Sequence, residues 1–148
     1  MSTCRNGGFA TSFSQRVEKS QGGGDDTALN SICLQCSTGD EVCSRTGFWG
    51  SWATSGKSSS GFDGAKLRFE QSIGRGDDTA ANELILYNGN TSYRTGNGGV
   101  WGDWLDLRRC PSGQRICGLK TRVEKSIGRG DDTALNGVVL QCCKKRKY

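Results

Sequence analysis

Gly24-Asp25-Asp26-Thr27-Ala28-Leu29-Asn30 occurs in two further copies along the chain, and this repetition decides the fold. The copies read Gly76-Asp77-Asp78-Thr79-Ala80-Ala81-Asn82 and Gly130-Asp131-Asp132-Thr133-Ala134-Leu135-Asn136. A spacing of 52 residues separates Asp25 from Asp77, and 54 residues separate Asp77 from Asp131. A repeat of this length, without a helical pattern, predicts three similar β-sheet modules arranged about a pseudo-threefold axis.

The segments on both sides of the motif alternate between two faces, as β-strands do. Upstream, Phe13, Gln15 and Val17 fall on one face, and that face stays apolar at Phe69 and Val123. Downstream, the apolar pairs are Ile32 with Leu34, Leu84 with Leu86, and Val138 with Leu140. Glycine-rich segments next to the motif permit the chain to reverse. Each repeat is therefore expected to contain two strands joined by a polar loop.

The composition agrees with an all-β fold, since 23 glycines and one proline in 148 residues suit short strands and tight turns. We expect one domain over residues 1–143, built of repeats at about 4–43, 44–96 and 97–143. A basic tail at 144–148 follows it and carries four units of the net charge of +5. The tail is either solvated or a docking patch for acidic glycans or an anionic surface.

Apolar runs long enough for a membrane helix are missing from the sequence, so we expect no membrane insertion. No leader-like segment precedes Cys4, which suggests a mature domain. Eight cysteines without a histidine make a zinc site improbable and are typical of a disulfide framework in a secreted protein. A nuclear signal fits poorly with so many cysteines, so we expect no nucleic-acid partner. No metal and no other cofactor is expected.

The repeat also predicts the disulfide pairing. Cys4 and Cys36 stand at the same offsets from Arg16 as Cys110 and Cys142 do from Arg122. The second repeat has Gly56 and Asn88 at those places, so both cysteines of a pair are present together or absent together. We therefore pair Cys4 with Cys36 and Cys110 with Cys142. Cys33 and Cys43 flank a short turn and form the third predicted bridge, which leaves Cys117 with Cys143.

All four tryptophans lie in two Trp-Gly-x-Trp motifs, at Trp49 with Trp52 and at Trp101 with Trp104. Simple alternation cannot place both tryptophans of a motif on one face, so the central glycine is expected to mark a bulge or a close backbone approach. The rings either pack in the core or form a stacking platform for sugar rings.

A third Trp-Gly-x-Trp motif should precede Cys4 if the repeat is complete, but only Met1–Thr3 stand there. Either the amino terminus is shortened or the first sheet lacks a strand that the other sheets have. Its exposed edge would need cover from the tail or from a partner.

The triplicated motif, the Trp-Gly-x-Trp segments, and the stretch from Ile116 to Glu124 that leads to Cys142-Cys143 together resemble the vitelline membrane outer layer protein I family. The resemblance covers essentially the whole chain and implies a β-prism of three antiparallel Greek-key sheets. The family is known from the outer layer of bird eggs and from secretions. It has been credited with lysozyme-like transfer or synthesis of N-acetylglucosamine oligosaccharides. The chain departs from the family pattern in the missing first motif, the unbridged second repeat and the added Cys33 and Cys43.

Two functions remain open from the sequence. One is a secreted structural or glycan-binding component of an extracellular coat, matrix or mucous secretion, whose partners would be oligosaccharides, glycoproteins or other coat or mucus proteins. The candidate glycan-binding residues are Asp26, Asp78, Asp132, Trp49, Trp52, Trp101 and Trp104. The repeated aspartates have a structural alternative, which is to hold their turns closed.

The alternative function is a lysozyme-like glycosyltransferase or hydrolase acting on N-acetylglucosamine oligosaccharides. Such chemistry needs two carboxylates in unequal environments, whereas the repeated acids recur in matching contexts. Among the acids that are not repeated, Asp103 inside the second tryptophan motif is the best catalytic candidate. The sequence therefore favours a protein that is not an enzyme.

Overall fold

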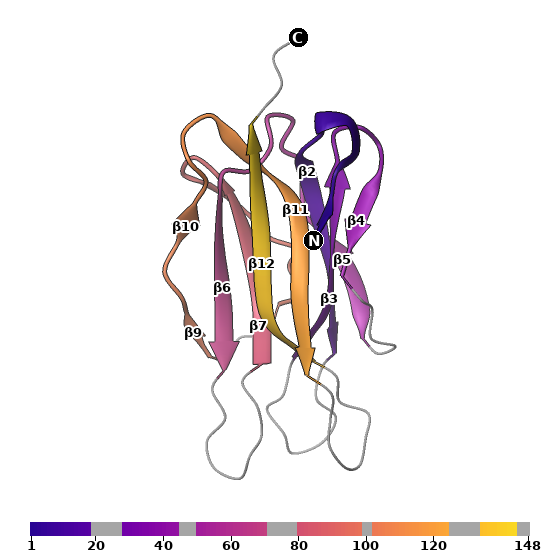
Figure 1. Cartoon of the computed structure of the whole chain (residues 1–148). Coiled ribbons are helices and arrows are strands. Elements are labelled where there is room, and N and C mark those ends of the chain that lie inside the picture. The colour runs from indigo at the N-terminus through magenta and orange to yellow at the C-terminus, as the bar shows by residue number, and fades with distance from the viewer. Residues whose placement is uncertain (19–27, 45–49, 71–79, 99–101, 125–133, 145–148) are drawn as a thin grey trace, which may run out of the picture.

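The computed structural model describes residues 1–18, 28–44, 50–70, 80–98, 102–124 and 134–144, and the fold is all-β with three antiparallel sheets (Figure 1). The first sheet has the order β4-β3-β2-β5 and consists of β2 (Ala10–Glu18), β3 (Ala28–Cys36), β4 (Glu41–Cys43) and β5 (Ser51–Thr54). The second contains β6 (Gly64–Glu70), β7 (Ala80–Asn88), β8 (Thr91–Tyr93), β9 (Asp103–Trp104) and β10 (Arg108–Arg109). The third has the order β1-β11-β12, from β1 (Ser2–Thr3), β11 (Gln114–Glu124) and β12 (Ala134–Lys144). A short 3-10 helix, Arg5–Gly7, follows β1.

The three long hairpins repeat one another in register. Each is interrupted by a shift at the same place of the repeat, between Arg16 and Val17, between Arg68 and Phe69, and between Arg122 and Val123. In the first two sheets a third strand continues the hairpin, and a fourth returns to lie beside the first strand. This is the Greek-key order. The all-β fold with three antiparallel sheets predicted from the sequence is confirmed.

Side chains from all three sheets meet in one core. Phe13, Gln15 and Val17 are all buried, which confirms the inward face predicted for this strand. Phe62, which precedes β6, is fully buried and packs edge-on against Phe13 and Tyr93, with ring centroids 6.3 and 5.2 Å apart. Such T-shaped contacts add to the stabilisation from burial of the rings. The hydrophobic alternation of the sequence therefore determines which face of each sheet is enclosed.

Four disulfides close the structure, and they are the four pairs expected from the sequence. Cys4–Cys36 and Cys110–Cys142 are equivalent, with Cα atoms 5.7 Å apart in both. Cys33 and Cys43 are direct register partners on β3 and β4. The fourth bridge joins Cys117 on β11 to Cys143 on β12. Every cysteine is in a bridge.

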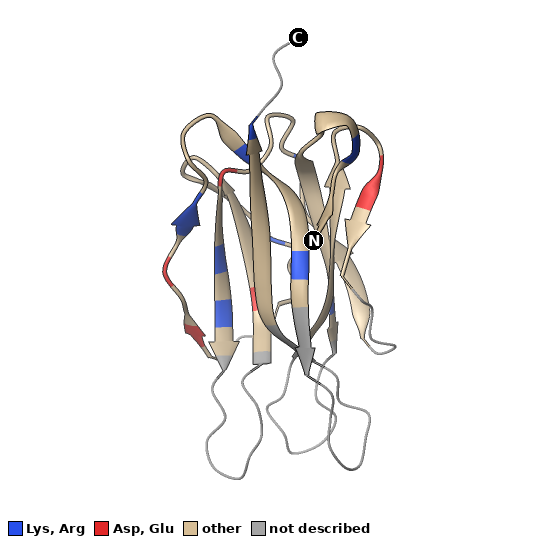
Figure 2. Ribbon diagram, viewed as in Figure 1, with Lys and Arg blue, Asp and Glu red and all other residues tan. Residues whose placement is uncertain are grey.

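Charged side chains are spread over the strands rather than gathered on one face. Figure 2 shows basic positions on β6, β10 and β11 and acidic positions on β7 and β9. Within the described residues, no helix is long and apolar enough to cross a membrane. The tail at 145–148 lies outside the described residues.

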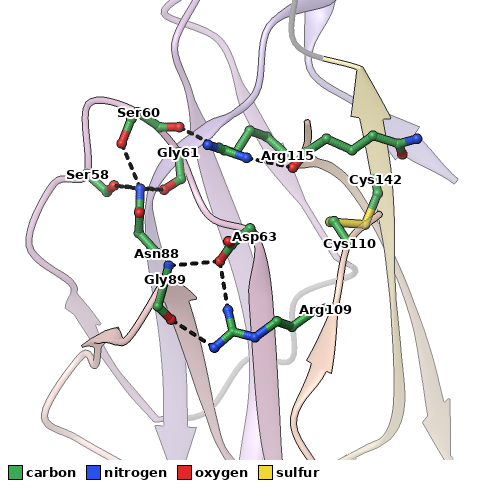
Figure 3. Close-up of polar contacts among 11 residues, drawn as sticks. Ser58, Ser60, Gly61, Asp63, Asn88, Gly89, Arg109, Cys110, Arg115 and Cys142 are labelled. Atoms are coloured by element: carbon green, nitrogen blue, oxygen red, sulfur yellow. Dashed lines mark hydrogen bonds and ion pairs between the residues drawn. A yellow bond between two sulfur atoms is a disulfide. The ribbon is translucent and has the colours of Figure 1, made fainter. Parts of the chain in front are cut away.

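Where the second repeat lacks a disulfide, hydrogen bonds take its place (Figure 3). The side-chain nitrogen of Asn88, which occupies the position of Cys36 and Cys142, lies 3.1 Å from Ser58 Oγ, 2.7 Å from Ser60 Oγ and 2.8 Å from the Gly61 carbonyl oxygen. The amide therefore holds the loop before β6 against the end of β7.

Asp63 and Arg109 extend this network at the turn after β7 (Figure 3). Asp63 Oδ1 accepts hydrogen bonds from the Gly89 backbone nitrogen at 3.0 Å and from the Arg109 guanidinium at 3.1 Å. Arg109 also donates to the Gly89 carbonyl oxygen at 2.9 Å. The turn after β7 is thus fastened to β10 without a covalent bond.

Among the described residues the third sheet has the fewest strands, whereas the first sheet has four. The alternative in which the first sheet lacks a strand is therefore wrong. The returning strands β5 and β9 pair with β2 and β6, the first hairpin strands of the sheets that precede them in the chain. The segment before Cys4 pairs with β11 by the same rule, through Ser2 and Thr3. A motif upstream of Cys4 would therefore belong to the third sheet.

Candidate functional site

The predicted site residues are only partly visible in the structure. Asp26, Asp78, Asp132, Trp49 and Trp101 lie outside the described residues. The structure describes Trp52 on β5, and Asp103 and Trp104 on β9. The glycan-binding role of each of these residues stays a prediction.

The two described tryptophans lie at the surface, and packing in the core is the wrong interpretation for Trp52, which is 43% exposed. Trp104 is half-buried. The central glycine of each motif has a left-handed backbone, with φ of 109° at Gly50 and 97° at Gly102. A residue with a side chain is strained in that conformation, which explains the central glycine of the motif.

Each tryptophan lies opposite the arginine at the same position of its repeat. Arg16 pairs with Trp52 across β2 and β5, and Arg68 pairs with Trp104 across β6 and β9. The Arg68 guanidinium carbon is 4.3 Å from the centroid of the Trp104 ring, and that of Arg16 is 6.0 Å from Trp52. Both are cation–π contacts, and the shorter one belongs to the second repeat.

A second arginine approaches Trp104, and it brings a buried carboxylate with it. Arg94 lies 5.8 Å from the Trp104 ring centroid. It donates two hydrogen bonds of 2.8 Å, one to each oxygen of Glu83. Glu83 is 2% exposed, whereas the Arg94 side chain is 51% exposed. The hydrogen bond from Arg94 to Glu83 raises the pKa of the guanidinium above its ordinary value. The pair is thus a bidentate ion pair with its carboxylate inside and its guanidinium at the surface.

These residues surround an open hollow of about 540 Å³ in the wall of the second sheet. The residues that line it are Arg68, Glu83, Arg94, Thr95, Gly96 and Gly98. Gly98 must be a glycine, because an added Cβ would lie 2.3 Å from Cγ of Glu83. The ring of Trp104 lies next to the hollow through its contacts with both arginines.

The rim of the hollow is fixed by contacts with the first sheet. The side-chain nitrogen of Asn97 donates to the carbonyl oxygens of Gln15 at 3.1 Å and Ser51 at 3.0 Å. Thr95 Oγ1 donates to Asn97 Oδ1 at 2.6 Å. Gln15 is fully buried, and its side-chain oxygen accepts from the Leu84 backbone nitrogen at 3.2 Å. The segment from Arg94 to Gly98 is therefore held by the first and second sheets, which pre-organises the site.

In the part of the chain that the structure describes, the Glu83–Arg94 ion pair occurs in the second sheet alone. The position of Glu83 is occupied by Ser31 in the first repeat and by Gly137 in the third. Ser31 is buried and shares a hydrogen bond of 3.1 Å with Ser44. Because the first and third repeats have an uncharged residue at this position, a charge there is not needed to build the sheet.

Glu83 and Arg94 are not among the site residues predicted from the sequence. Glu83 is an acid that is not repeated, but it lies on a strand with apolar neighbours, and nothing in the sequence shows that Arg94 faces it. The pairing of β8 with β7 brings the two together. Glu83 could have been identified as a charge at a position that is neutral in the sister repeats.

The chemistry that this arrangement offers is binding rather than acid–base catalysis. Both oxygens of Glu83 accept from Arg94, so this carboxylate is engaged as an ion-pair acceptor. Asp103 is exposed, on the strand that carries Trp104. An aromatic ring, guanidinium donors and backbone groups of a glycine-containing segment can stack against and hydrogen-bond a polar ligand.

A cluster with metal-ligand atoms does not form a second site. Sγ of Cys33, Sγ of Cys43 and a carboxylate oxygen of Glu41 lie within 4.8 Å of one another. The two sulfurs are bonded to each other, so they are not the thiolates that bind a metal.

Comparison with known proteins finds similarity to one family over nearly the whole chain. Residues 1–145 match the family model described as Vitelline membrane outer layer protein I. The chain is 40% identical to the human vitelline membrane outer layer protein 1 homolog over 151 aligned residues, which cover 95% of this chain and 74% of the human protein. It is 39% identical to the mouse homolog over 150 residues, with the same coverage of each chain.

Proposed function

Because the chain belongs to the vitelline membrane outer layer protein I family, we propose that it is a secreted component of an extracellular coat, matrix or mucous secretion and that it binds glycans. Four disulfides are typical of an extracellular protein, and membership of this family supports the same location. The names of the human and mouse relatives refer to the outer layer of the vitelline membrane, and a coat role for this chain is part of the proposal.

The observation that carries the glycan-binding proposal is the set of groups around Trp104. Trp104 is half-buried and has an aromatic ring, the kind of group that stacks on a sugar ring. It lies beside Arg94, whose side chain is 51% exposed. Thr95 and Gly96 supply further polar groups on the same rim. Small-molecule sites combine an apolar surface with a few placed polar groups in this way.

Rigid positioning supports the same function. The rim segment is tied to β2 and to Ser51 through Asn97, and its arginine is anchored by a buried carboxylate. A ligand then binds without first ordering the site, which removes part of the entropic cost of association.

A glycan array followed by titration with N-acetylglucosamine oligosaccharides tests the proposal. We expect saturable binding that Trp104→Ala weakens at least tenfold, a loss of about 1.4 kcal/mol. Trp52→Ala is the matched control, because Trp52 belongs to the equivalent motif and contacts the equivalent arginine, Arg16, whereas its sheet has Ser31 at the position of Glu83. Trp52→Ala should therefore have the smaller effect.

Three results contradict the proposal in different ways. Equal losses of glycan affinity in Trp104→Ala and Trp52→Ala would contradict a special role of the second sheet in binding. The absence of any glycan ligand would leave a structural coat component. Cleavage or transfer products in the same mixtures, lost in Asp103→Asn, would establish the enzyme instead.

A further inference from the structure

Asn90, in the turn between β7 and β8, begins a short sequence that occurs once in the chain. Asn90-Thr91-Ser92 has the form Asn-x-Ser, in which the middle residue is not proline. This is the acceptor sequence for N-linked glycosylation of secreted proteins. At every other asparagine, the residue two positions further on is neither serine nor threonine. These other asparagines are Asn6, Asn30, Asn82, Asn88, Asn97 and Asn136.

The turn leaves the Asn90 side chain accessible. Asn88 and Thr91 are register partners, so Gly89 and Asn90 form a two-residue hairpin loop. Gly89 has a φ of 55°, which suits a tight hairpin loop with glycine in its first position. Asn90 is exposed, and its side-chain amide makes no hydrogen bond within the described residues. The amide nitrogen is therefore available for a covalent bond.

The surroundings of the turn leave room for a large attached group. A Cβ added to Gly89 would meet no heavy atom within 4 Å. Thr91 and Ser92 are exposed, as Asn90 is. β8 is the outermost strand of the second sheet, so no described strand covers the turn from that side. A glycan on Asn90 can therefore extend into solvent without moving any part of the sheet.

The fold uses the two residues before Asn90 and not Asn90 itself. The side chain of Asn88 holds the loop before β6. The backbone of Gly89 is fastened to Asp63 and Arg109 (Figure 3). An oligosaccharide on the next residue leaves both sets of hydrogen bonds in place.

We propose that Asn90 is a modification site that carries an N-linked oligosaccharide in the secreted protein. The inference rests on the secreted location in the proposed function, because the modification takes place in the secretory pathway. Nδ2 of Asn90 forms a bond to the anomeric carbon of an oligosaccharide, and the bond from that carbon to a lipid-linked diphosphate breaks. The diphosphate leaves with the electrons of that bond, and one proton of the amide passes to the transferase. The hydroxyl that the acceptor sequence requires is that of Ser92.

The modified turn is separate from the hollow beside Trp104. Glu83, which lines the hollow, and Asn88 both lie on β7, five positions apart. At about 3.3 Å per residue, this places the turn roughly 17 Å from the hollow along the strand. The attached glycan and the proposed oligosaccharide site are therefore independent features of the second sheet.

Expression of the full chain behind a cleavable signal peptide in cultured animal cells tests the modification. We expect secreted protein whose mobility on a denaturing gel increases after treatment with peptide N-glycosidase. This enzyme converts a glycosylated asparagine into aspartate. Digestion in heavy-oxygen water followed by peptide mass spectrometry should therefore find the labelled aspartate at position 90 and at no other asparagine.

Four variants locate the glycan. Asn90→Gln and Ser92→Ala should each abolish the mobility shift, since each removes a group that the acceptor sequence requires. Thr91→Ala is the matched control, because the middle position accepts any residue except proline. Ser92→Thr keeps the hydroxyl. Both of these variants should retain the glycan.

A secreted chain whose mobility does not change on treatment with peptide N-glycosidase would refute the modification and leave the secreted location standing. A mobility shift that persists in Asn90→Gln would refute the assignment to this turn. Unmodified chain retained inside the cells would contradict the secreted location as well as the modification.

Discussion

Individual residues account for the difference between the three repeats. Glu83 forms an ion pair with Arg94, whereas Ser31, at the same position of the first repeat, shares a hydrogen bond with Ser44. Asn88 makes hydrogen bonds at the position where the other two repeats have a disulfide cysteine. The repeated residues build the sheets, and the second repeat differs from its sisters at a few side chains.

Arg94→Ala should destabilise the protein, because it leaves the buried Glu83 carboxylate without its partner. Breaking a buried pair from one side costs about 3–5 kcal/mol, and the exposure of Arg94 places this case at about 3 kcal/mol. Denaturant unfolding would measure the loss. Replacing Glu83 by serine in the same chain, the residue of the first repeat, should restore most of it. A double variant as unstable as Arg94→Ala would show that the guanidinium acts through other contacts.

Asn88→Ala should lower the free energy of unfolding by about 1–3 kcal/mol, since it removes the hydrogen bonds that hold the loop around Ser58 to Gly61. Exposed Asn90, two residues further along the same turn, provides the control. Thermal or urea unfolding of both alanine variants makes the comparison. Equal stability of the two would contradict the view that Asn88 replaces the missing bridge.

The elements follow from the sequence to different extents. The long hairpins were predictable, because alternation and the repeated loop motif define both strands and the turn between them. Two of the disulfides were predictable from matching offsets, a third from the short turn between Cys33 and Cys43, and the fourth from the two cysteines that remained. The short strands β8, β9 and β10 were not, since two or three residues carry too little alternation to reveal a partner.

The repeat alone does not show which sheet each tryptophan motif belongs to. A tryptophan motif stands between two hairpins in the sequence, and nothing in its residues says which of the two it joins. Pairing of β5 with β2 and of β9 with β6 assigns each motif to the preceding hairpin. The candidate site was missed for a related reason, because Glu83 and Arg94 meet only through the register of β7 and β8.

The disulfides should differ in how much they stabilise their elements. Cys4–Cys36 closes a loop with a sequence separation of 32, and Cys33–Cys43 one with a separation of 10. In the chain-entropy description, the larger loop contributes about 1 kcal/mol more. Replacing each pair by alanine and measuring urea unfolding compares them. A larger loss from the Cys33–Cys43 pair would show that local packing, and not loop length, sets the effect.

The whole molecule combines a repeated scaffold with one site that is not repeated. Three sheets share a core and four bridges, while the hollow beside Trp104 occurs in the second sheet. The family and the three-sheet fold could be predicted from the repeated motif because both depend on residues that recur. The hollow could not, because it depends on where strands and a loop from two repeats meet.

NMR titration of the full chain with an N-acetylglucosamine oligosaccharide tests the proposed glycan site most directly, because it reports every residue at once. The account predicts chemical-shift changes centred on the Trp104 indole, Arg94 and the segment from Thr95 to Gly98. Equal changes in the three Gly-Asp-Asp loops, at Asp26, Asp78 and Asp132, would contradict it and place binding on the repeated motif instead. No change at any residue up to millimolar sugar would contradict the glycan-binding function itself.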